Sequence, residues 1–354
     1  MDRPSERFMQ RCFDLARLGA GTTSPNPLVG AVLVHDRRII GEGYHQAYGQ
    51  AHAEVNAVAS VLPADTHLIP HSTLYVSLEP CDIHGNTPPC TRLILDQKIP
   101  RVVISYIDHS PGVDGAGVAR LREAGVEVVV GLLGKEGEEL SLPRNTFVRQ
   151  NRPYVILKFA QSKAGIFAPP ENRQLWLSND YSKRLTHRWR SEVDAVLVGA
   201  NTAIADNPQL TNRYYFGRSP RRIVLDRLGN LPHSLALFDG KEPTLVYSEK
   251  KSTPEPSNNV RYHHLTFDGQ MARNLLASLA GQKISLLMVE GGIKTLHAFM
   301  QAGLWDEARV FLADRYVPEG RKAPVLPEPP VKTYPLGKDE LLFFRNPLQS
   351  LNLH

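Results

Sequence analysis

The sequence has few cysteines and no long apolar run. Only three cysteines, Cys12, Cys81 and Cys90, occur in 354 residues, and two of them lie in one short segment, so a disulfide framework is excluded. No stretch of about 18 apolar residues could span a bilayer. Residues 1–10 lack the apolar core of a signal peptide. We therefore expect a cytoplasmic protein without a membrane span, in a compartment that keeps thiols reduced.

The charge balance is weak. A net charge of +5 over 354 residues suits an anionic small molecule and does not require nucleic acid. The length predicts two domains. In the first, Cys12 shares the apolar stripe of a predicted helix over 6–18 with Phe8 and Leu15, so we interpret it as a buried thiol.

Four residues suggest a metal centre. His52, Cys81 and Cys90 could bind zinc and leave one coordination position open, and Glu54 lies two residues after the histidine. A His-x-Glu segment followed by Pro-Cys is typical of zinc-dependent base deaminases, in which the carboxylate transfers protons. Eight residues separate the two cysteines, where the common form has two. A closed structural site with His84 as a fourth ligand is the alternative.

Apolar segments of strand length alternate with helical patterns along the whole chain. We expect strands over 28–34, 74–78, 102–105, 126–130, 154–160, 195–198, 222–225, 244–247, 284–289 and 308–312. Helices are expected near 52–61, 90–97, 116–124, 179–190, 270–280 and 294–302. This alternation predicts α/β sheets with crossover connections. The metal ligands fall at strand-to-helix junctions, where such sheets place their sites.

Polar and proline-rich segments mark the boundaries. Residues 140–153 are basic and contain Pro143 and Pro153, and we expect them to join domains 1–148 and 149–354. Residues 252–259 are predicted to form a surface loop. The proline cluster at 324–335 is interpreted as an irregular, exposed arm. Such an arm could form a subunit interface, so a homo-oligomer is one expectation.

In the second half, the residues alone are less informative. Glu290, Gly291 and Gly292 follow an apolar strand and precede a helix, so backbone N–H groups there could approach a phosphate. A plain tight turn is the alternative. The polar segment from Asp206 to Arg213, after the strand at 195–198, has the composition of an ordinary loop.

Three segments of the first half carry a family resemblance. Pro25-Asn26-Pro27-Leu28-Val29-Gly30, His52-Ala53-Glu54-Val55-Asn56-Ala57 and the stretch from Leu78 through Cys90 resemble the bifunctional riboflavin-biosynthesis deaminase–reductases. That family has the same eight-residue cysteine loop. The resemblance implies an N-terminal cytidine-deaminase-like three-layer domain in which His52, Cys81 and Cys90 bind zinc and Glu54 transfers the proton. It implies substrate contacts from Asn26, His84 and Asp108; a loop-capping role for Asp108 is the alternative.

The second half resembles the reductase part of the same family. Residues 176–178, 190–191, 198–213, 222–226 and 289–292 carry this resemblance. It implies a dihydrofolate-reductase-like α/β fold that uses NADPH to reduce the ribose of a phosphorylated pyrimidine. The implied cofactor contacts are Ala160, Trp176, Thr202, Asp206, Gly291 and Gly292. The implied substrate contacts are Gln174, Arg190, Leu210, Arg213 and Glu290.

Two departures from the family pattern bear on activity. Asn86 stands where the family has a cation near its substrate, and Ala164 and Ile166 replace an acid and a base after the first reductase strand. A deaminase with a weak or inactive reductase half is therefore an alternative. The sequence does not distinguish which arginine would bind the 2′-phosphate of NADPH. The candidates are Arg221, Arg222 and Arg227.

Two other classes of protein share parts of this sequence pattern. A nucleic-acid base deaminase would need a basic, aromatic-interleaved strip. Residues 184–190 are the nearest candidate, but helical spacing spreads their side chains around the axis. The other class is a non-catalytic zinc-binding scaffold, in which Glu54 would have no function.

Overall fold

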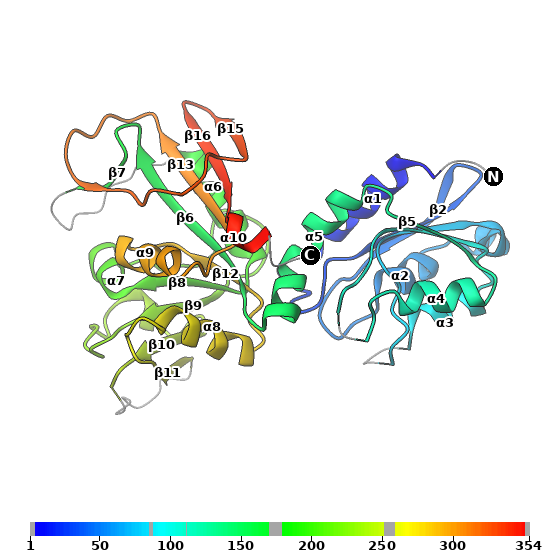
Figure 1. Ribbon diagram of the computed structural model, residues 1–354, viewed down its shortest axis with the longest axis horizontal. Helices are drawn as coiled ribbons and strands as arrows, with labels where there is room; N and C mark the ends of the chain where they lie inside the picture. The colour runs from blue at the N-terminus through cyan, green and yellow to red at the C-terminus, as the bar shows by residue number, and fades with distance from the viewer. Residues whose placement is uncertain (1–3, 85–87, 111, 170–178, 251–258, 351–354) are drawn as a thin grey trace. The chain divides into compact units, whose positions relative to one another are not determined.

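The computed structural model describes residues 4–84, 88–110, 112–169, 179–250 and 259–350. They belong to two compact units, Met1–Asn151 and Arg152–His354 (Figure 1). No helix in the described part of the chain is long and apolar enough to cross a membrane.

The first unit is built on a five-stranded mixed sheet. From edge to edge its strands are β2 (Arg38–Tyr44), β1 (Gly30–His35), β3 (Thr73–Leu78), β4 (Arg101–Tyr106) and β5 (Glu127–Val130). β3, β4 and β5 run parallel, and β1 is antiparallel to both of its neighbours. The parallel strands therefore end at one edge, where their following loops meet.

Helices cover both faces of this sheet. One face is covered by α1 (Glu6–Arg17) and α5 (Gly134–Gln150), and the other by α2 (Ala53–Ala59), α3 (Cys90–Asp96) and α4 (Ala116–Glu123), with a 3-10 helix at Pro63–His71. Alternate residues of each strand enter the two cores: Leu33 packs toward α2, and Val32 packs toward α1. The predicted three-layer arrangement is confirmed. Cys12 is buried in the α1 layer, as expected.

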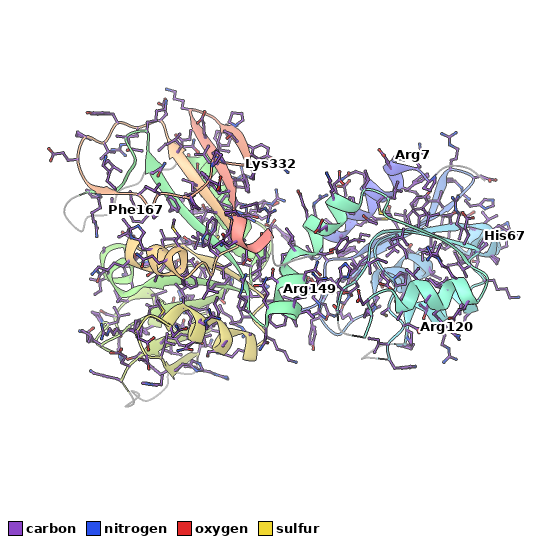
Figure 2. The ribbon with its side chains drawn as sticks, viewed as in Figure 1. Arg7, His67, Arg120, Arg149, Phe167 and Lys332 are labelled. Atoms are coloured by element: carbon purple, nitrogen blue, oxygen red, sulfur yellow. The ribbon has the colours of Figure 1, made fainter. Side chains whose placement is uncertain are left out.

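The boundary between the two units falls after Asn151, inside the junction predicted over 140–153, but most of that segment is helical rather than a linker, because α5 runs through it to Gln150 (Figure 2, where Arg149 lies in its last turn). Gly137, Ser141 and Asn145 form its buried face at intervals of four residues. A side chain at position 137 would clash with Ser105 Oγ on β4. The buried stripe is small and polar rather than apolar, so hydrophobic periodicity did not reveal the helix.

Strand β2 was also missed, because Gly41 and Gly43 interrupt its apolar pattern. Both glycines lie under α2, and a Cβ at Gly43 would clash with the backbone nitrogen of Ala57. The helix that begins after His52 therefore packs backbone to backbone on the sheet. This close approach of α2 to the sheet determines where His52, the residue before the helix, lies relative to the strands.

The second unit contains a nine-stranded sheet. Its order is β11 (Val260–His264), β10 (Thr244–Ser248), β9 (Arg221–Leu225), β8 (Ala195–Gly199), β12 (Leu286–Val289), β6 (Tyr154–Ser162), β13 (Glu307–Ala313), β16 (Asp339–Arg345) and β15 (Lys332–Leu336). A separate small ribbon pairs β7 (Ile166–Ala168) with β14 (Arg321–Lys322). The strands from β11 to β13 are parallel. The strand order reverses around β12, and such a switch point opens a crevice at the carboxyl ends.

Helices again lie on the sheet faces. They are α6 (Asp180–Glu192), α7 (Ala200–Asp206), α8 (Met271–Gly281) and α9 (Ile293–Gln301), with short turns of helix at Ala236–Phe238 and Pro347–Ser350. Leu275 and Leu279 of α8 and Phe299 of α9 share one core with Leu197 and Leu287 of the sheet. The predicted α/β class of this half is confirmed.

The arm predicted over 324–335 is only partly irregular. Its last residues enter β15, which pairs antiparallel with β16 at the edge of the sheet. Pro335 is tolerated because β15 is an edge strand. Of the surface loop predicted at 252–259, residues 252–258 lie outside the described residues.

Candidate metal centre and ligand pocket

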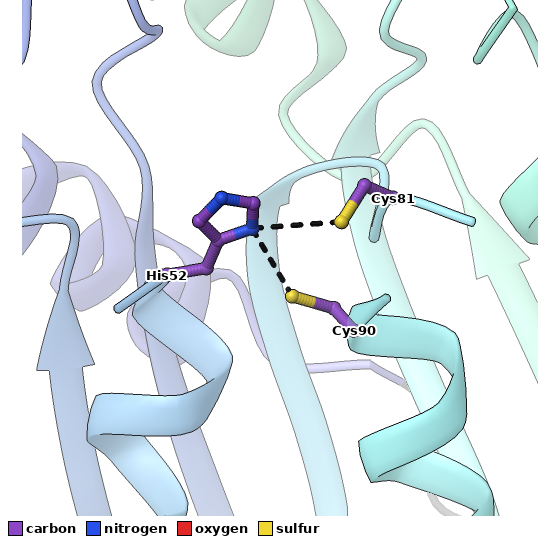
Figure 3. A group of neighbouring side chains, drawn as sticks. All are labelled: His52, Cys81 and Cys90. Carbon is purple, nitrogen blue, oxygen red and sulfur yellow. Dashed lines mark hydrogen bonds between the residues drawn. The ribbon is translucent and has the colours of Figure 1, made fainter. Parts of the chain in front are cut away.

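Three ligand side chains converge at the edge where β3 ends. His52 caps the start of α2, Cys90 is the first residue of α3, and Cys81 follows β3. His52 Nδ1 lies 3.5 Å from Cys81 Sγ and 3.3 Å from Cys90 Sγ (Figure 3). The three ligand atoms all lie within 4.8 Å of one another.

This donor set fits zinc. Zn–N near 2.05 Å and Zn–S near 2.3 Å at tetrahedral angles place the nitrogen and a sulfur about 3.5 Å apart, close to the separations of His52 from both cysteines. Two thiolates and one imidazole are also soft ligands of the type that selects zinc. His84 is exposed and is not part of the group. Three protein ligands leave a position for a non-protein ligand, as in catalytic sites.

Glu54 lies in the first turn of α2 and is only 3% exposed. Burial, and then the charge of Cys81, raise the pKa of its carboxyl, which also contacts Cys90. The pKa of Cys81 is lowered to about 4, first because the Cys90 thiol donates to it and then because His52 does. The site therefore holds a thiolate ready for a metal beside a carboxyl poised to exchange a proton.

Next to the ligands lies a pair that sequence reasoning missed. His45 Nδ1 lies 3.0 Å from the carbonyl of Ala51, so this nitrogen is the donor. His45 Nε2 must then accept, and it lies 3.1 Å from Asn26 Nδ2. Burial lowers the pKa of His45, which favours this neutral form. The ring also packs edge-on against His52, at 5.5 Å between centroids.

The loop after β4 is held by a buried carboxylate. Glu79, at the end of β3, accepts backbone N–H groups from Asp108, Gly115, Gly117 and Val118 at 2.9–3.3 Å. Asp108 Oδ1 accepts the N–H of Ser110 at 2.9 Å, which matches the loop-capping alternative. Arg144 of α5 contacts both this loop and the residue before Asn26: its Nη1 donates to the Pro25 carbonyl at 3.2 Å, and its guanidinium interacts with the charge of Asp108.

In the second unit, a cavity of about 1210 Å³ opens at the carboxyl ends of the parallel strands. It exceeds the roughly 300–1,000 Å³ of ordinary small-molecule pockets, so it has room for a dinucleotide together with a second ligand. Eight of the predicted residues line it: Ala160, Arg190, Thr202, Asp206, Leu210, Arg213, Glu290 and Gly292. Gly291 is not among the lining residues. Gln174 and Trp176 lie outside the described residues.

A buried ion pair, Arg190–Glu290, lines this pocket. Arg190 Nε and Nη2 donate to the two oxygens of Glu290 at 2.7 and 2.8 Å, and Arg190 Nη1 donates to the Thr211 carbonyl. Burial alone would raise the pKa of Glu290, but Arg190 and then Lys158 lower it to about 2. Glu290 is therefore ionised, and its neighbour Lys158, 4.0 Å away on β6, points into the same pocket.

The turn after β12 comes close to α7. Gly291 has a φ of +114°, a conformation that side chains rarely adopt. A Cβ at Gly292 would lie 2.7 Å from Thr202 Oγ1. Both glycines are therefore needed for the backbone to form this wall of the pocket. Phe167 of β7 lies near this turn, with its Cζ 3.6 Å from a Cβ built on Gly291.

His187 and Lys183 of α6 were not predicted as pocket residues. His187 Nδ1 accepts the backbone N–H of Arg213 at 2.9 Å. Burial, and then the charges of Arg190 and Arg213, lower the pKa of His187 to about 4. The exposed Arg213 side chain donates to Gln209 and Thr211. No pattern in the sequence marks His187, because it lies inside an ordinary helical segment.

The strip considered for nucleic acid is not a continuous surface. On α6, His187, Trp189 and Arg190 are buried, whereas Arg184 and Arg188 are exposed. Trp189 stacks on Phe311, at 5.3 Å between ring centroids. Of the residues in the strip, Trp189, His187 and Arg190 therefore lie inside the domain, and only Arg184 and Arg188 lie on its surface.

The Ala164/Ile166 departure lies in the turn between β6 and β7. Ile166 is buried, and its N–H donates to Ser162 Oγ at 3.2 Å. The Gly165 carbonyl accepts the N–H of Ala323 at 2.9 Å. Backbone bonds and apolar packing thus hold the turn, and neither Ala164 nor Ile166 lines the large pocket.

Two family models match the two halves. The model of the cytidine and deoxycytidylate deaminase zinc-binding region matches residues 2–106, and the model of the RibD C-terminal domain matches residues 153–332. A riboflavin biosynthesis protein RibD of Aquifex aeolicus is 39% identical over 318 residues, which cover 89% of this chain and 88% of that protein. The Escherichia coli RibD is 33% identical over 328 residues, 88% of each chain.

Solved structures agree over nearly the whole length. A diaminohydroxyphosphoribosylaminopyrimidine deaminase/5-amino-6-(5-phosphoribosylamino)uracil reductase of Thermotoga maritima has a TM-score of 0.88 at 35% identity, covering 96% of this chain and 98% of that chain. An Acinetobacter baumannii RibD has a TM-score of 0.84 at 29% identity over the same shares.

Proposed function

The chain belongs to the RibD family of riboflavin-biosynthesis deaminase–reductases, and on this premise we propose how its residues divide the two reactions. It is a bifunctional enzyme of riboflavin biosynthesis that combines a zinc-dependent deaminase with an NADPH-dependent reductase. The small molecule on which it acts is a phosphorylated pyrimidine. The alternatives of a nucleic-acid deaminase and of a non-catalytic scaffold are therefore set aside.

We assign the deaminase to the unit Met1–Asn151 and the reductase to Arg152–His354. This division lies close to the one predicted between residues 148 and 149. It is supported by α5, which packs on β4 of the first sheet and ends at Gln150. The free thiols of the metal centre support a cytoplasmic, reducing compartment. Self-association stays a prediction, which light scattering on the purified protein would test.

In the deaminase, His52, Cys81 and Cys90 hold the zinc. The metal supplies Lewis acidity and lowers the pKa of a water molecule. Glu54 is the catalytic base and acid: its buried carboxylate accepts a proton from the attacking water and delivers it to the departing amino group as ammonia leaves. Burial raises the pKa of this carboxyl, so it takes up a proton more readily than an exposed glutamate, which suits a group that must first accept a proton and then deliver it.

Asn26 binds the pyrimidine. Its amide N–H is used by His45, so its Oδ1 is the atom offered to a donor on the substrate. Asp108 and His84 lie on the two loops that flank the metal ligands, and we propose that they contact the ribosyl part of the substrate. Asp108 would do so with Oδ2, since Oδ1 is occupied by Ser110.

In the reductase, NADPH supplies the hydride that opens the ribose to a ribityl chain. The reductase assignment rests on the buried Arg190–Glu290 pair, which lines a cavity large enough for two ligands. Arg190 holds Glu290 ionised so that it can accept a sugar hydroxyl, and the exposed Arg213 can pair with the phosphate. Leu210 and Gln174 complete the substrate side.

The cofactor side comprises Ala160, Thr202, Asp206, Trp176 and the turn at Gly291 and Gly292. The N–H groups at the start of α9 follow this turn and suit a phosphate group. Burial raises the pKa of Asp206, so its carboxyl is better suited to hydrogen bonding than to pairing with a cation.

One experiment tests both assignments. The diaminopyrimidine ribosyl phosphate is supplied with and without NADPH, and products are separated by chromatography. Deaminated ribosyl product without cofactor, and deaminated ribityl product with it, are expected. Deamination without any NADPH oxidation would overturn the reductase assignment and leave the deaminase assignment intact.

A further inference from the structure

We propose that Arg227, held by Glu249, recognises the 2′-phosphate of NADPH and so sets the preference for NADPH over NADH. This inference rests on the proposed reductase pocket. The sequence left three arginines as candidates, and the structure separates them by their positions on β9.

Arg222 is excluded because its side chain is fully used inside the protein. It is 0% exposed, and its guanidinium donates to Thr244 Oγ1, Asp239 and the carbonyls of Ala236 and Glu242. Moving it to a ligand would break all of these bonds and leave buried acceptors unpaired. Arg222 therefore holds the strand ends of this region together.

Arg221 is excluded as the 2′-phosphate ligand because it lies at the wrong end of β9. It is the first residue of β9, at the amino end of the strand, and its Nη1 bonds the carbonyl of Gln282. The pocket opens at the carboxyl ends of the parallel strands, and Arg221 is not among its lining residues. Its exposed side chain makes it a suitable control.

Arg227 lies two residues after the end of β9 and lines the pocket. Its backbone carbonyl accepts the Glu249 N–H at 3.1 Å and Ser248 Oγ at 3.3 Å. The preceding Asp226 accepts the N–H groups of Asn230 and Leu231, which closes the turn. The base of the Arg227 side chain is therefore fixed at the pocket rim.

Glu249 connects Arg227 to a second lining residue, Phe267. Its Oε2 accepts Arg227 Nε at 3.0 Å, and its Oε1 accepts the N–H of Phe267 at 2.9 Å. The Phe267 N–H, and then Arg227, lower the pKa of Glu249, so it is ionised. Phe267 also lines the pocket. With Nε held by Glu249, the terminal nitrogens of Arg227 are left to form the forked contact that suits a phosphate.

The surroundings of Arg227 match the adenosine end of a dinucleotide. Leu225, Leu228, Phe267 and Met271 give this end of the pocket an apolar lining, to which Arg227 adds a cation. The Arg190–Glu290 pair lies at β12, two strands from β9 in the sheet order. That is about 10 Å at the usual strand spacing, so the substrate end and the Arg227 end are distinct.

The test measures binding of adenosine 2′,5′-bisphosphate and of 5′-AMP by calorimetry on the full-length protein. These probes differ only in the 2′-phosphate. The wild-type protein is expected to bind the bisphosphate about 10- to 100-fold more tightly. Arg227→Met should bring the two affinities within about twofold while leaving 5′-AMP binding unchanged. Arg227→Lys should keep part of the preference, because it keeps the charge without the fork.

Arg221→Met is the matched control and should keep the wild-type ratio. A wild-type preference that survives in Arg227→Met, or that is lost equally in Arg221→Met, would overturn the proposal. Absence of binding of either probe to the wild-type protein would instead overturn the cofactor pocket itself, and with it this inference. Circular dichroism of each variant checks that the sheet is intact.

Discussion

His45 Nε2 accepts a hydrogen bond from the Asn26 side-chain amide at 3.1 Å, and His45 Nδ1 is committed to the Ala51 carbonyl. Together these two bonds determine which end of the Asn26 amide is turned toward His45. Asn26 Nδ2 is therefore held against His45, and Oδ1 at the other corner of the amide is the acceptor that Asn26 can offer to a ligand. His45 acts as a positioning residue, since its effect on the substrate passes through Asn26.

Replacing His45 with phenylalanine should lower kcat/KM of the deaminase about 10-fold. The change removes both hydrogen bonds of the His45 ring; the one to Asn26 is worth about 1 kcal/mol, and its loss lets the Asn26 amide rotate away from the substrate. The loss should appear mainly in KM, with zinc content by mass spectrometry unchanged. His45→Gln, which can offer an acceptor in a similar place, should recover part of the loss. Equal losses in both variants would count against the positioning role.

Glu54→Gln should abolish deamination while the protein keeps its zinc. The amide has nearly the same shape but cannot take up a proton, so we expect the deaminase turnover to fall at least about 100-fold. The reductase, supplied with deaminated substrate, should retain wild-type turnover in the same preparation. Loss of zinc in this variant would show that Glu54 maintains the metal centre rather than transferring protons.

His187 makes the stability of the second unit depend on pH. Because burial and the neighbouring arginines lower its pKa to about 4, the unfolded chain binds a proton below about pH 6.5 that the folded state does not bind. The contribution of the neutral His187 ring to the free energy of unfolding is therefore complete above about pH 6.5 and is lost as the pH falls toward 4. His187→Asn should flatten the decline in unfolding temperature over this range, measured by scanning calorimetry. Parallel profiles for both proteins would refute this assignment.

Glu79 should be important for stability although it touches no ligand atom. Glu79→Ala leaves four backbone N–H groups without their carboxylate, and we expect the free energy of unfolding to fall by roughly 2–4 kcal/mol in urea titrations. Glu79→Gln keeps one acceptor oxygen and should cost less. The Glu79→Ala variant should also raise the deaminase KM, because the Asp108 loop loosens.

The zinc site was predictable because its ligands and its carboxylate can be identified from residue types and short spacings alone. His52 and Glu54 are two residues apart, and the thiols of Cys81 and Cys90 have few other uses in a chain with three cysteines. By contrast, Asn26 and His45 are 19 residues apart, and only the fold brings them together. Pairings of that kind leave no local signal.

Two of the missed elements, α5 and β2, have a common physical cause. Apolar periodicity detects helices and strands that bury large side chains, whereas α5 buries Gly137, Ser141 and Asn145, and β2 approaches α2 through Gly41 and Gly43. Close backbone-to-backbone packing requires glycine or another small residue at the contact. The sequence of such a segment therefore resembles that of a loop. The parallel strands of both sheets other than β11 were predicted because their runs are apolar, as in strands buried on both faces; β11 is mostly polar and was missed.

The turn at Ala164 and Ile166 should not silence the reductase. Its conformation is held by the Ser162 and Ala323 bonds and by burial of Ile166, all outside the large pocket. We expect the wild-type protein to oxidise NADPH when given deaminated substrate, and Ala164→Asp to leave the turnover within about twofold, as for an ordinary surface change. Ile166→Lys should instead lower the unfolding temperature, because it buries an unpaired charge. If the double variant Ala164→Asp/Ile166→Lys reduced its substrate about 10-fold faster than the wild-type protein, a gain of about 1.4 kcal/mol in transition-state stabilisation, the lost pair would have to take part in the reaction.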